Sequence, residues 1–146
     1  MSWAVDTDVL LRTTDIGNAA QPIAEATLIA LRRNGESLSI FPQNLIEFWA
    51  VATRPAVNNG LGLSIAQAES ELNILKTMFV LLNDTPEIYS AWERIVIRYQ
   101  VTGKQAHDAR LVAAMELHNL SHLLTFNDND FKRFTEITVV NPQNVT

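Results

Sequence analysis

The chain has 146 residues, of which 47% are apolar, and a formal net charge of −5 from 16 acidic against 11 basic residues. This length and apolar content predict a single domain over residues 1–146 with one substantial core. The acidic balance argues against a protein that holds nucleic acid on a broad cationic surface. It leaves room for a nucleic-acid enzyme, because an acidic pocket loaded with a divalent ion is locally positive.

The chain contains no cysteine, which excludes disulfides, thiolate zinc sites and cysteine nucleophiles. Its first residues, MSWAVDTD, lack a cationic segment followed by a long apolar one, as a secretory signal would have. No run approaches the ~18 apolar residues of a membrane-spanning helix. We therefore expect a cytoplasmic protein that does not associate with membranes.

The first stretch, WAVDTDVLLR over residues 3–12, joins a short apolar run to two acids. Residues 3–5 predict a buried strand, Asp6 and Asp8 belong to an acidic turn, and residues 9–11 begin a helix. Ligands of open α/β sheets bind beyond the carboxyl ends of the strands, so Asp6 is expected at the functional edge. The alternative is an Asp that only caps the following helix.

Downstream, short apolar runs alternate with helical periodicity. Further strands are predicted at residues 37–41, 78–82, 121–126 and 137–140. Helices are predicted at residues 22–33, 45–52, from 64 onward, 85–100 and 106–118, with a short helical segment that holds Phe131 and Phe134. Strands separated by helices over one core imply a mostly parallel central sheet, so the predicted fold is a three-layer α/β/α sandwich.

Two more acids fall on helix faces that are otherwise apolar. Glu47 lies in the helix of residues 45–52, which is apolar nearly all round and is expected to be buried on more than one side. A carboxylate there needs a partner. Asp108 shares a face with Leu111, Val112 and Met115, which directs it toward the core. For Asp108 the alternative is a first-turn acid that only faces the helix macrodipole.

Polar residues also follow the predicted strand at 121–126. Asn127, Asp128 and Asp130 are placed there at the carboxyl edge, and an Asn/Asp-rich turn with Asp130 as N-cap is the alternative. Thr7 and Thr125 are candidate hydroxyl donors near a metal or a phosphate. For both, an ordinary threonine bonded to backbone is the alternative.

These acids are expected to converge on one edge of the sheet. Carboxylates that share a site raise one another's pKa unless a cation lies between them. Oxygen ligands without histidine or cysteine suit Mg²⁺ or Mn²⁺ and suit zinc poorly. The sequence therefore predicts a divalent metal site built from oxygen ligands.

Five segments in order closely resemble the PIN-domain ribonucleases, specifically the VapC-type toxins of toxin–antitoxin pairs. The segments are VDTDVLLR, NLIEFWAVATRP, NNGLGLS, HDARLVAAM and LLTFNDNDFKRF. The resemblance covers nearly the whole chain. It implies that Asp6, Glu47 and Asp108 take the places of the family's three principal metal-binding acids.

The resemblance is less definite for the other acidic positions. The family's fourth acidic position maps onto Asn127 and Asp130, which leaves Asp128 as a peripheral acid. Asp8 stands where the family commonly has Asn or Ser, so it adds one negative charge. Catalytic roles are thus expected for Asp6, Glu47, Asp108 and Asp130, with Asn127, Asp8, Thr7 and Thr125 as possible support.

The resemblance also implies an activity and partners. The expected reaction is Mg²⁺- or Mn²⁺-dependent hydrolysis of RNA phosphodiester bonds, in which a carboxylate accepts a proton from water. The expected partners are an RNA substrate, a cognate antitoxin and a second copy of the chain in a homodimer.

Two other classes fit parts of the sequence. The string AVDTDVLL also fits haloacid dehalogenase-like phosphatases, in which Asp6 would be the nucleophile and Asp8 the acid/base. That class lacks a partner here for its later Gly-Asp loop and leaves Glu47 unexplained. The other class is a non-catalytic PIN-like interaction module, against which the retention of all the acids argues.

Overall fold

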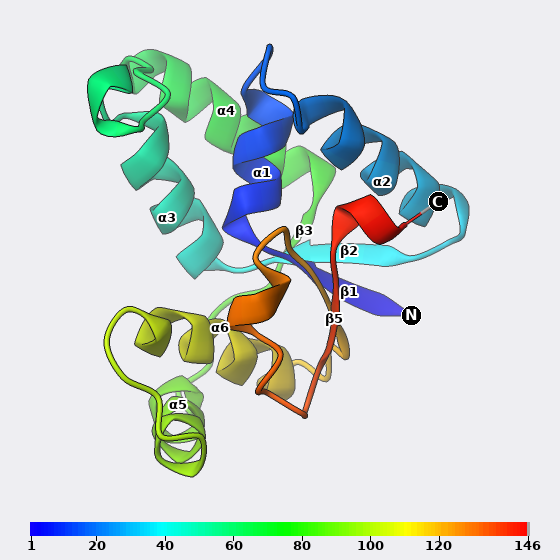
Figure 1. Ribbon diagram of the computed structural model, residues 1–146, viewed down its shortest axis with the longest axis vertical. Helices are drawn as coiled ribbons and strands as arrows, with labels where there is room; N and C mark the ends of the chain where they lie inside the picture. Colours follow the sequence, from blue (N-terminus) through cyan, green and yellow to red (C-terminus); the bar gives the residue numbers. More distant parts are fainter. Residues whose placement is uncertain (146) are drawn as a thin grey trace.

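Five parallel strands form one sheet in the computed structural model, which describes residues 1–145 (Figure 1). The strands are β1 (Ser2–Val5), β2 (Ser37–Ile40), β3 (Val80–Leu81), β4 (His122–Leu124) and β5 (Thr138–Val140). Their order is β3-β2-β1-β4-β5, with every adjacent pair parallel. The predicted central sheet is confirmed, and it places β1 in the middle.

Helices make up most of the remaining chain. They are α1 (Thr7–Thr14), α2 (Gln21–Arg33), α3 (Pro42–Ala52), α4 (Ile65–Met78), α5 (Ile88–Arg98) and α6 (Gln105–Leu117). Three short 3-10 helices are η1 (Ala56–Asn58), η2 (Asp128–Asp130) and η3 (Pro142–Asn144). No helix within residues 1–145 is long and apolar enough to cross a membrane.

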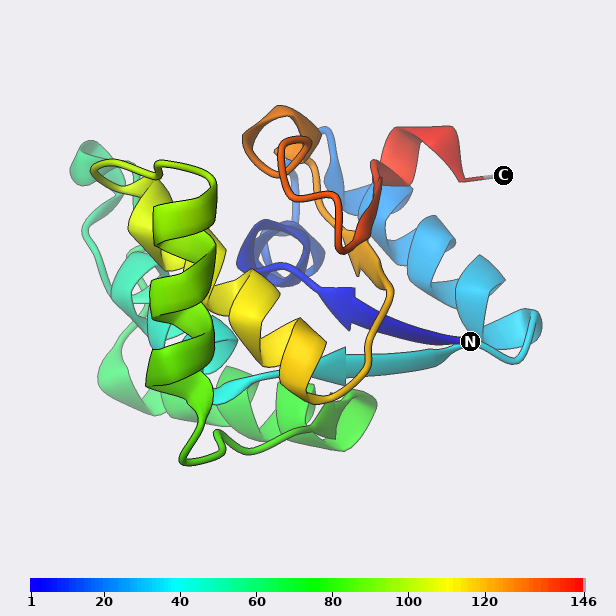
Figure 2. The same ribbon diagram turned by 90° about the horizontal axis from the view of Figure 1, so that it is seen from below.

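The helices cover both faces of the sheet, as Figures 1 and 2 show. Helices α1 to α4 pack on one face around a cluster that includes Val5, Leu10 and Phe48. Helices α5 and α6 pack on the other face around a cluster that includes Ala4 and Met115. Adjacent residues of β1 serve opposite clusters because side chains alternate along a strand. The three-layer α/β/α prediction is confirmed.

Several predicted boundaries were wrong. The strands expected at 78–82, 121–126 and 137–140 are shorter, since Met78 still belongs to α4 and Thr125 already lies beyond β4. Helix α5 begins at Ile88 rather than 85, because a turn precedes it. The segment with Phe131 and Phe134 is not helical; the 3-10 helix η2 comes before it.

Two features of the helices also differ from expectation. Helix α3 begins earlier than predicted, at Pro42, which suits a first-turn position because proline has no N–H to leave unbonded. Its expected burial on more than one side was wrong, because Ile46 is 69% exposed. Helix α4 begins with the predicted capping box of Ser64 and Gln67.

The loop after α3 folds back onto the end of that helix. Backbone N–H groups of Leu61 and Leu63 donate to carbonyls at the end of α3, at 3.1 and 2.9 Å. These bonds satisfy carbonyls that a helix end otherwise leaves free. Gly60 fits against the helix because it has no side chain: a Cβ there would lie 2.0 Å from the carbonyl oxygen of Arg54.

Gly60→Ala is therefore expected to lower the free energy of unfolding by about 3 kcal/mol, since the methyl group collides with backbone. Gly62→Ala is the matched control. A Cβ there meets nothing nearer than 3.7 Å but the residue keeps a φ of +66°, so the expected cost is about 1 kcal/mol. Urea unfolding of both variants measures the difference. Equal losses would show that the approach to Arg54 is not tight.

Candidate active site

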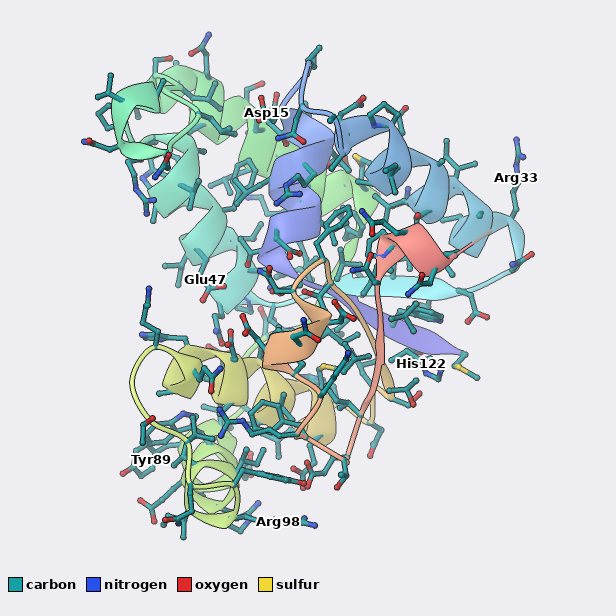
Figure 3. The ribbon with its side chains drawn as sticks, viewed as in Figure 1. Asp15, Arg33, Glu47, Tyr89, Arg98 and His122 are labelled. Atoms are coloured by element: carbon teal, nitrogen blue, oxygen red, sulfur yellow. The ribbon has the colours of Figure 1, made fainter. Side chains whose placement is uncertain are left out.

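The carboxyl ends of β1, β2 and β4 meet at one edge of the sheet, because all three strands are parallel. Asp6 follows β1 directly and Thr125 follows β4. Glu47 comes to the same region from α3, on the side that faces α6 in Figure 3. His122 lies at the other end of the sheet, where it pairs with Trp3.

Asp6 is buried, with 8% of its surface exposed. It caps α1, accepting from the backbone N–H of Thr7 at 2.8 Å, and its other oxygen accepts from the Thr125 hydroxyl at 2.8 Å. Burial and the nearby charges of Asp8 and Glu47 raise the pKa of Asp6 to about 8. Asp6 therefore does cap α1, as the alternative interpretation expected. Capping alone does not explain why this acid is buried beside two other acids.

Asp8 joins the β1–α1 turn to the segment after β4. One oxygen, Oδ2, accepts from the Phe126 backbone N–H at 3.1 Å and lies 3.3 Å from the Thr125 hydroxyl. The other, Oδ1, is buried and accepts no hydrogen bond from residues 1–145. Burial raises the pKa of Asp8 to about 6, and the charge of Arg12 opposes that rise.

Both carboxylate oxygens of Glu47 accept hydrogen bonds, as expected for an acid on an otherwise apolar helix. The Thr7 hydroxyl donates to Oε1 at 2.8 Å, and the Gln43 amide donates to Oε2 at 3.2 Å. Asn44 in turn donates to the Thr7 hydroxyl at 3.2 Å. Thr7 and Thr125 therefore give their hydroxyl hydrogens to acids, not to backbone.

Asp108 lies in the first turn of α6 and is half-buried. Burial raises its pKa to about 6, helped by the charges of Asp130 and Glu47 and opposed by those of His107 and Arg133. Glu47 is thus close enough to act on both Asp6 and Asp108. Asp130 acts on Asp108, so the four predicted acids form a series from Asp6 through Glu47 and Asp108 to Asp130.

The remaining predicted positions lie after β4. The backbone N–H of Asn127 donates to the Thr125 hydroxyl at 3.0 Å, and the Asn127 side chain is exposed. Asp128 accepts a hydrogen bond from the Asn141 amide at 3.2 Å and lies 3.8 Å from the Lys132 ammonium.

The donor set fits a hard divalent cation. All of its candidate ligands are carboxylates, burial and neighbouring carboxylates raise the pKa of Asp6 and Asp108, and Asp8 keeps a buried oxygen with no partner among residues 1–145. Over residues 1–145, however, no three acidic or histidine side chains already stand arranged as ligands of one ion. The ligand types therefore suit Mg²⁺ or Mn²⁺, although residues 1–145 do not already form a complete set of ligands around one point.

The metal-free protein is expected to lose stability as pH rises from about 4 to about 8. Asp6 ionises near its ordinary value of 3.8 when unfolded but near 8 when folded, so the folded state keeps a proton that the unfolded state releases. The free energy of unfolding then falls with pH, by on the order of 2 kcal/mol or more. Asp6→Asn should flatten this dependence. Urea unfolding in EDTA tests it, and parallel profiles for the two proteins would contradict it.

Sequence reasoning missed two residues of this region, Gln43 and Asn44. Both are buried, and both support Glu47 directly or through Thr7. A signal was present: Gln43 lies four residues before Glu47, hence on the same face of an otherwise apolar helix. Their partners on other elements could not be read from that spacing.

The sheet and the acids beyond its carboxyl edge place the chain in the class of parallel α/β proteins. Within that class, the chain belongs to the PIN domain family, whose model matches residues 4–137. No curated protein sequence matches the chain.

Solved structures share the fold. A chain of VapBC2 from Rickettsia felis, bound to a promoter DNA fragment, has a TM-score of 0.74 at 16% identity, covering 97% of this chain and 98% of that one. VapBC-1 from Haemophilus influenzae has a TM-score of 0.70 at 16% identity, with 99% and 100% covered. VapC20 from Mycobacterium tuberculosis, described as a sarcin–ricin loop cleaving toxin, has a TM-score of 0.67 at 18% identity, with 90% and 95% covered.

Proposed function

We propose that the chain is a metal-dependent ribonuclease that hydrolyses RNA phosphodiester bonds as the toxin of a toxin–antitoxin pair. The observation that carries the proposal is the set of acids at the carboxyl edge, where burial raises the pKa of Asp6 and Asp108 and the charge of Glu47 adds to both rises. Membership of the PIN family supports it, and so does the fold shared with toxins of that kind.

In this proposal Asp6, Glu47, Asp108 and Asp130 hold Mg²⁺ or Mn²⁺. Such an ion supplies the Lewis acidity that makes water nucleophilic near neutral pH and offsets charge on the phosphate. Thr7 and Thr125 hold Glu47 and Asp6 in place through their hydroxyl groups. Asp108 is the acid we assign to accept the proton from water, since it is half-exposed in the first turn of α6.

Substrate reaches Glu47 from an open cavity of about 500 Å³ between α3 and α6. The cavity is lined by Gln43, Ile46, Glu47, His107 and Arg110. Incubation of the purified protein with a total RNA pool, in Mg²⁺, Mn²⁺ or EDTA, tests the proposal. We expect cleavage with either ion and none in EDTA; intact RNA under all three conditions would contradict it.

The proposed partners are a cognate antitoxin and a second copy of the chain. A structure from Klebsiella pneumoniae that shares this fold, with a TM-score of 0.66, is described as a toxin–antitoxin complex. Helices α3 and α4 carry an apolar hollow of about 250 Å³ between Leu45, Ile46, Trp49 and Leu72. Apolar surface of this kind is a common place for a protein partner to bind.

Asp8→Asn separates this proposal from the phosphatase alternative. An Asn oxygen can still accept from the Phe126 N–H, and the change removes a like charge beside Asp6, so most RNA cleavage should remain, within about tenfold of wild type. In a phosphatase that uses Asp8 as acid/base, the same change would be crippling. Rates of RNA cleavage and mass spectrometry for a phosphorylated Asp6 after a small phosphate ester decide the matter. A phosphorylated Asp6 would overturn the ribonuclease proposal.

A further inference from the structure

The side chain of Gln43 is buried, with 8% exposed, and every polar atom of its amide is used. Its Nε2 donates to Glu47 Oε2 at 3.2 Å and to the His107 carbonyl oxygen at 2.7 Å. Its Oε1 accepts from Arg110 Nη1 at 3.0 Å. Gln43 thus contacts one predicted metal ligand, Glu47, and two residues of α6.

These neighbours determine which way the amide points. Arg110 can only donate, so it must face Oε1; an ionised Glu47 and a carbonyl can only accept, so they must face Nε2. A glutamate at position 43 would lose both donated bonds, and an apolar residue would lose all three bonds. The position therefore requires one acceptor and two donors at the end of a side chain of this length, which is a glutamine.

The same bonds join the two helices that carry acids of the site. Glu47 is on α3, and the His107 carbonyl immediately precedes Asp108 on α6. Arg110 is held from its far side by Asp84, at 3.0 Å. Thr7 bonds the other oxygen of Glu47, so Gln43 completes the restraint on that carboxylate.

We propose that Gln43 is a positioning residue, which fixes the Glu47 carboxylate relative to Asp108 so that the two can share a divalent cation. The inference rests on the metal site of the proposed function. Hydrogen-bond partners that orient metal ligands typically change metal affinity or activity by about 10- to 100-fold when they are removed. Gln43 would act through Glu47 and would touch neither metal nor RNA.

The test measures the Mn²⁺ affinity of the full chain. The EPR signal of free Mn²⁺ reports how much of the ion is unbound, and this method can measure dissociation constants into the millimolar range. Gln43→Met, an unbranched replacement of similar length, should weaken Mn²⁺ binding by about 10- to 100-fold. In a Glu47→Gln background the same change should alter the affinity by less than about twofold, because its route of action is gone. Gln43→Ala serves as the second variant where the Met variant does not fold.

Asp84→Asn is the matched control, because it weakens the bond to Arg110 while sparing the bond from Gln43 to Glu47. It should leave Mn²⁺ affinity unchanged within about twofold. Unchanged binding in Gln43→Met, or equal weakening in both backgrounds, would reduce Gln43 to a structural tie between α3 and α6 and overturn the inference. So would a wild-type protein that binds no Mn²⁺. If wild type binds Mn²⁺ as expected but leaves RNA intact, the ribonuclease proposal fails and the role of Gln43 stands.

Discussion

Asp6→Asn, Glu47→Gln and Asp108→Asn will each reduce RNA cleavage by at least about a thousandfold while leaving the fold intact. Each change removes one negative ligand from the proposed ion but keeps the size of the side chain. In Asp6→Asn the amide oxygen can still cap α1, and the neutral side chain removes the cost of burying an ionised carboxylate. The metal-free Asp6 variant should therefore melt at a higher temperature than wild type.

The loss of activity is measured as the rate of cleavage of a total RNA pool with Mg²⁺ or Mn²⁺ present. The gain in stability is measured separately, as the melting temperature in EDTA. Asp128→Asn is the control, since Asp128 faces Asn141 and Lys132 and should retain activity. Full activity in Asp108→Asn would remove that residue from the site. Loss of activity with loss of fold would assign the effect to stability instead.

Mg²⁺ will weaken binding of the proposed antitoxin by about tenfold or more, because both compete for the same carboxylates. An arginine from the partner can satisfy Asp6 or Asp108 through bidentate hydrogen bonds, as a fixed cation in place of the ion. Asp6→Asn and Asp108→Asn should for the same reason weaken the complex even without metal.

Calorimetric titration of the purified pair, with Mg²⁺ or with NaCl at equal ionic strength, isolates competition from screening. The Asp128→Asn variant should bind as wild type does. An affinity that is indifferent to Mg²⁺ and to both substitutions would mean that inhibition occurs away from the acids.

The position of Asp6 could be predicted because it follows an apolar run that had to be a strand in a parallel sheet. Thr125 was expected inside the strand at 121–126, but it follows β4, which ends at Leu124. Strand ends were less predictable. Residues 78–82 are apolar, yet Met78 remains helical, because an apolar run alone does not distinguish the end of a buried helix from a strand.

Helix α3 shows where sequence reasoning stopped. Its apolar residues predicted burial on more than one side, but Ile46 is exposed, while polar Gln43 and Asn44 are buried. Their burial depends on Glu47, Thr7 and α6, which come together only in the folded chain. A side chain whose role is to hydrogen-bond another side chain leaves no periodic pattern in the sequence, so its role cannot be predicted from periodicity.

In the proposed function, acids from four elements hold a divalent ion at the carboxyl edge of the sheet. A crystal of the protein soaked in Mn²⁺ and measured at the manganese absorption edge tests it most directly. We expect an anomalous peak in contact with carboxylate oxygens of Asp6 and Asp108, with Glu47 or Asp130 beside it. A Mn²⁺ peak elsewhere, or none at this edge at saturating Mn²⁺, would contradict it.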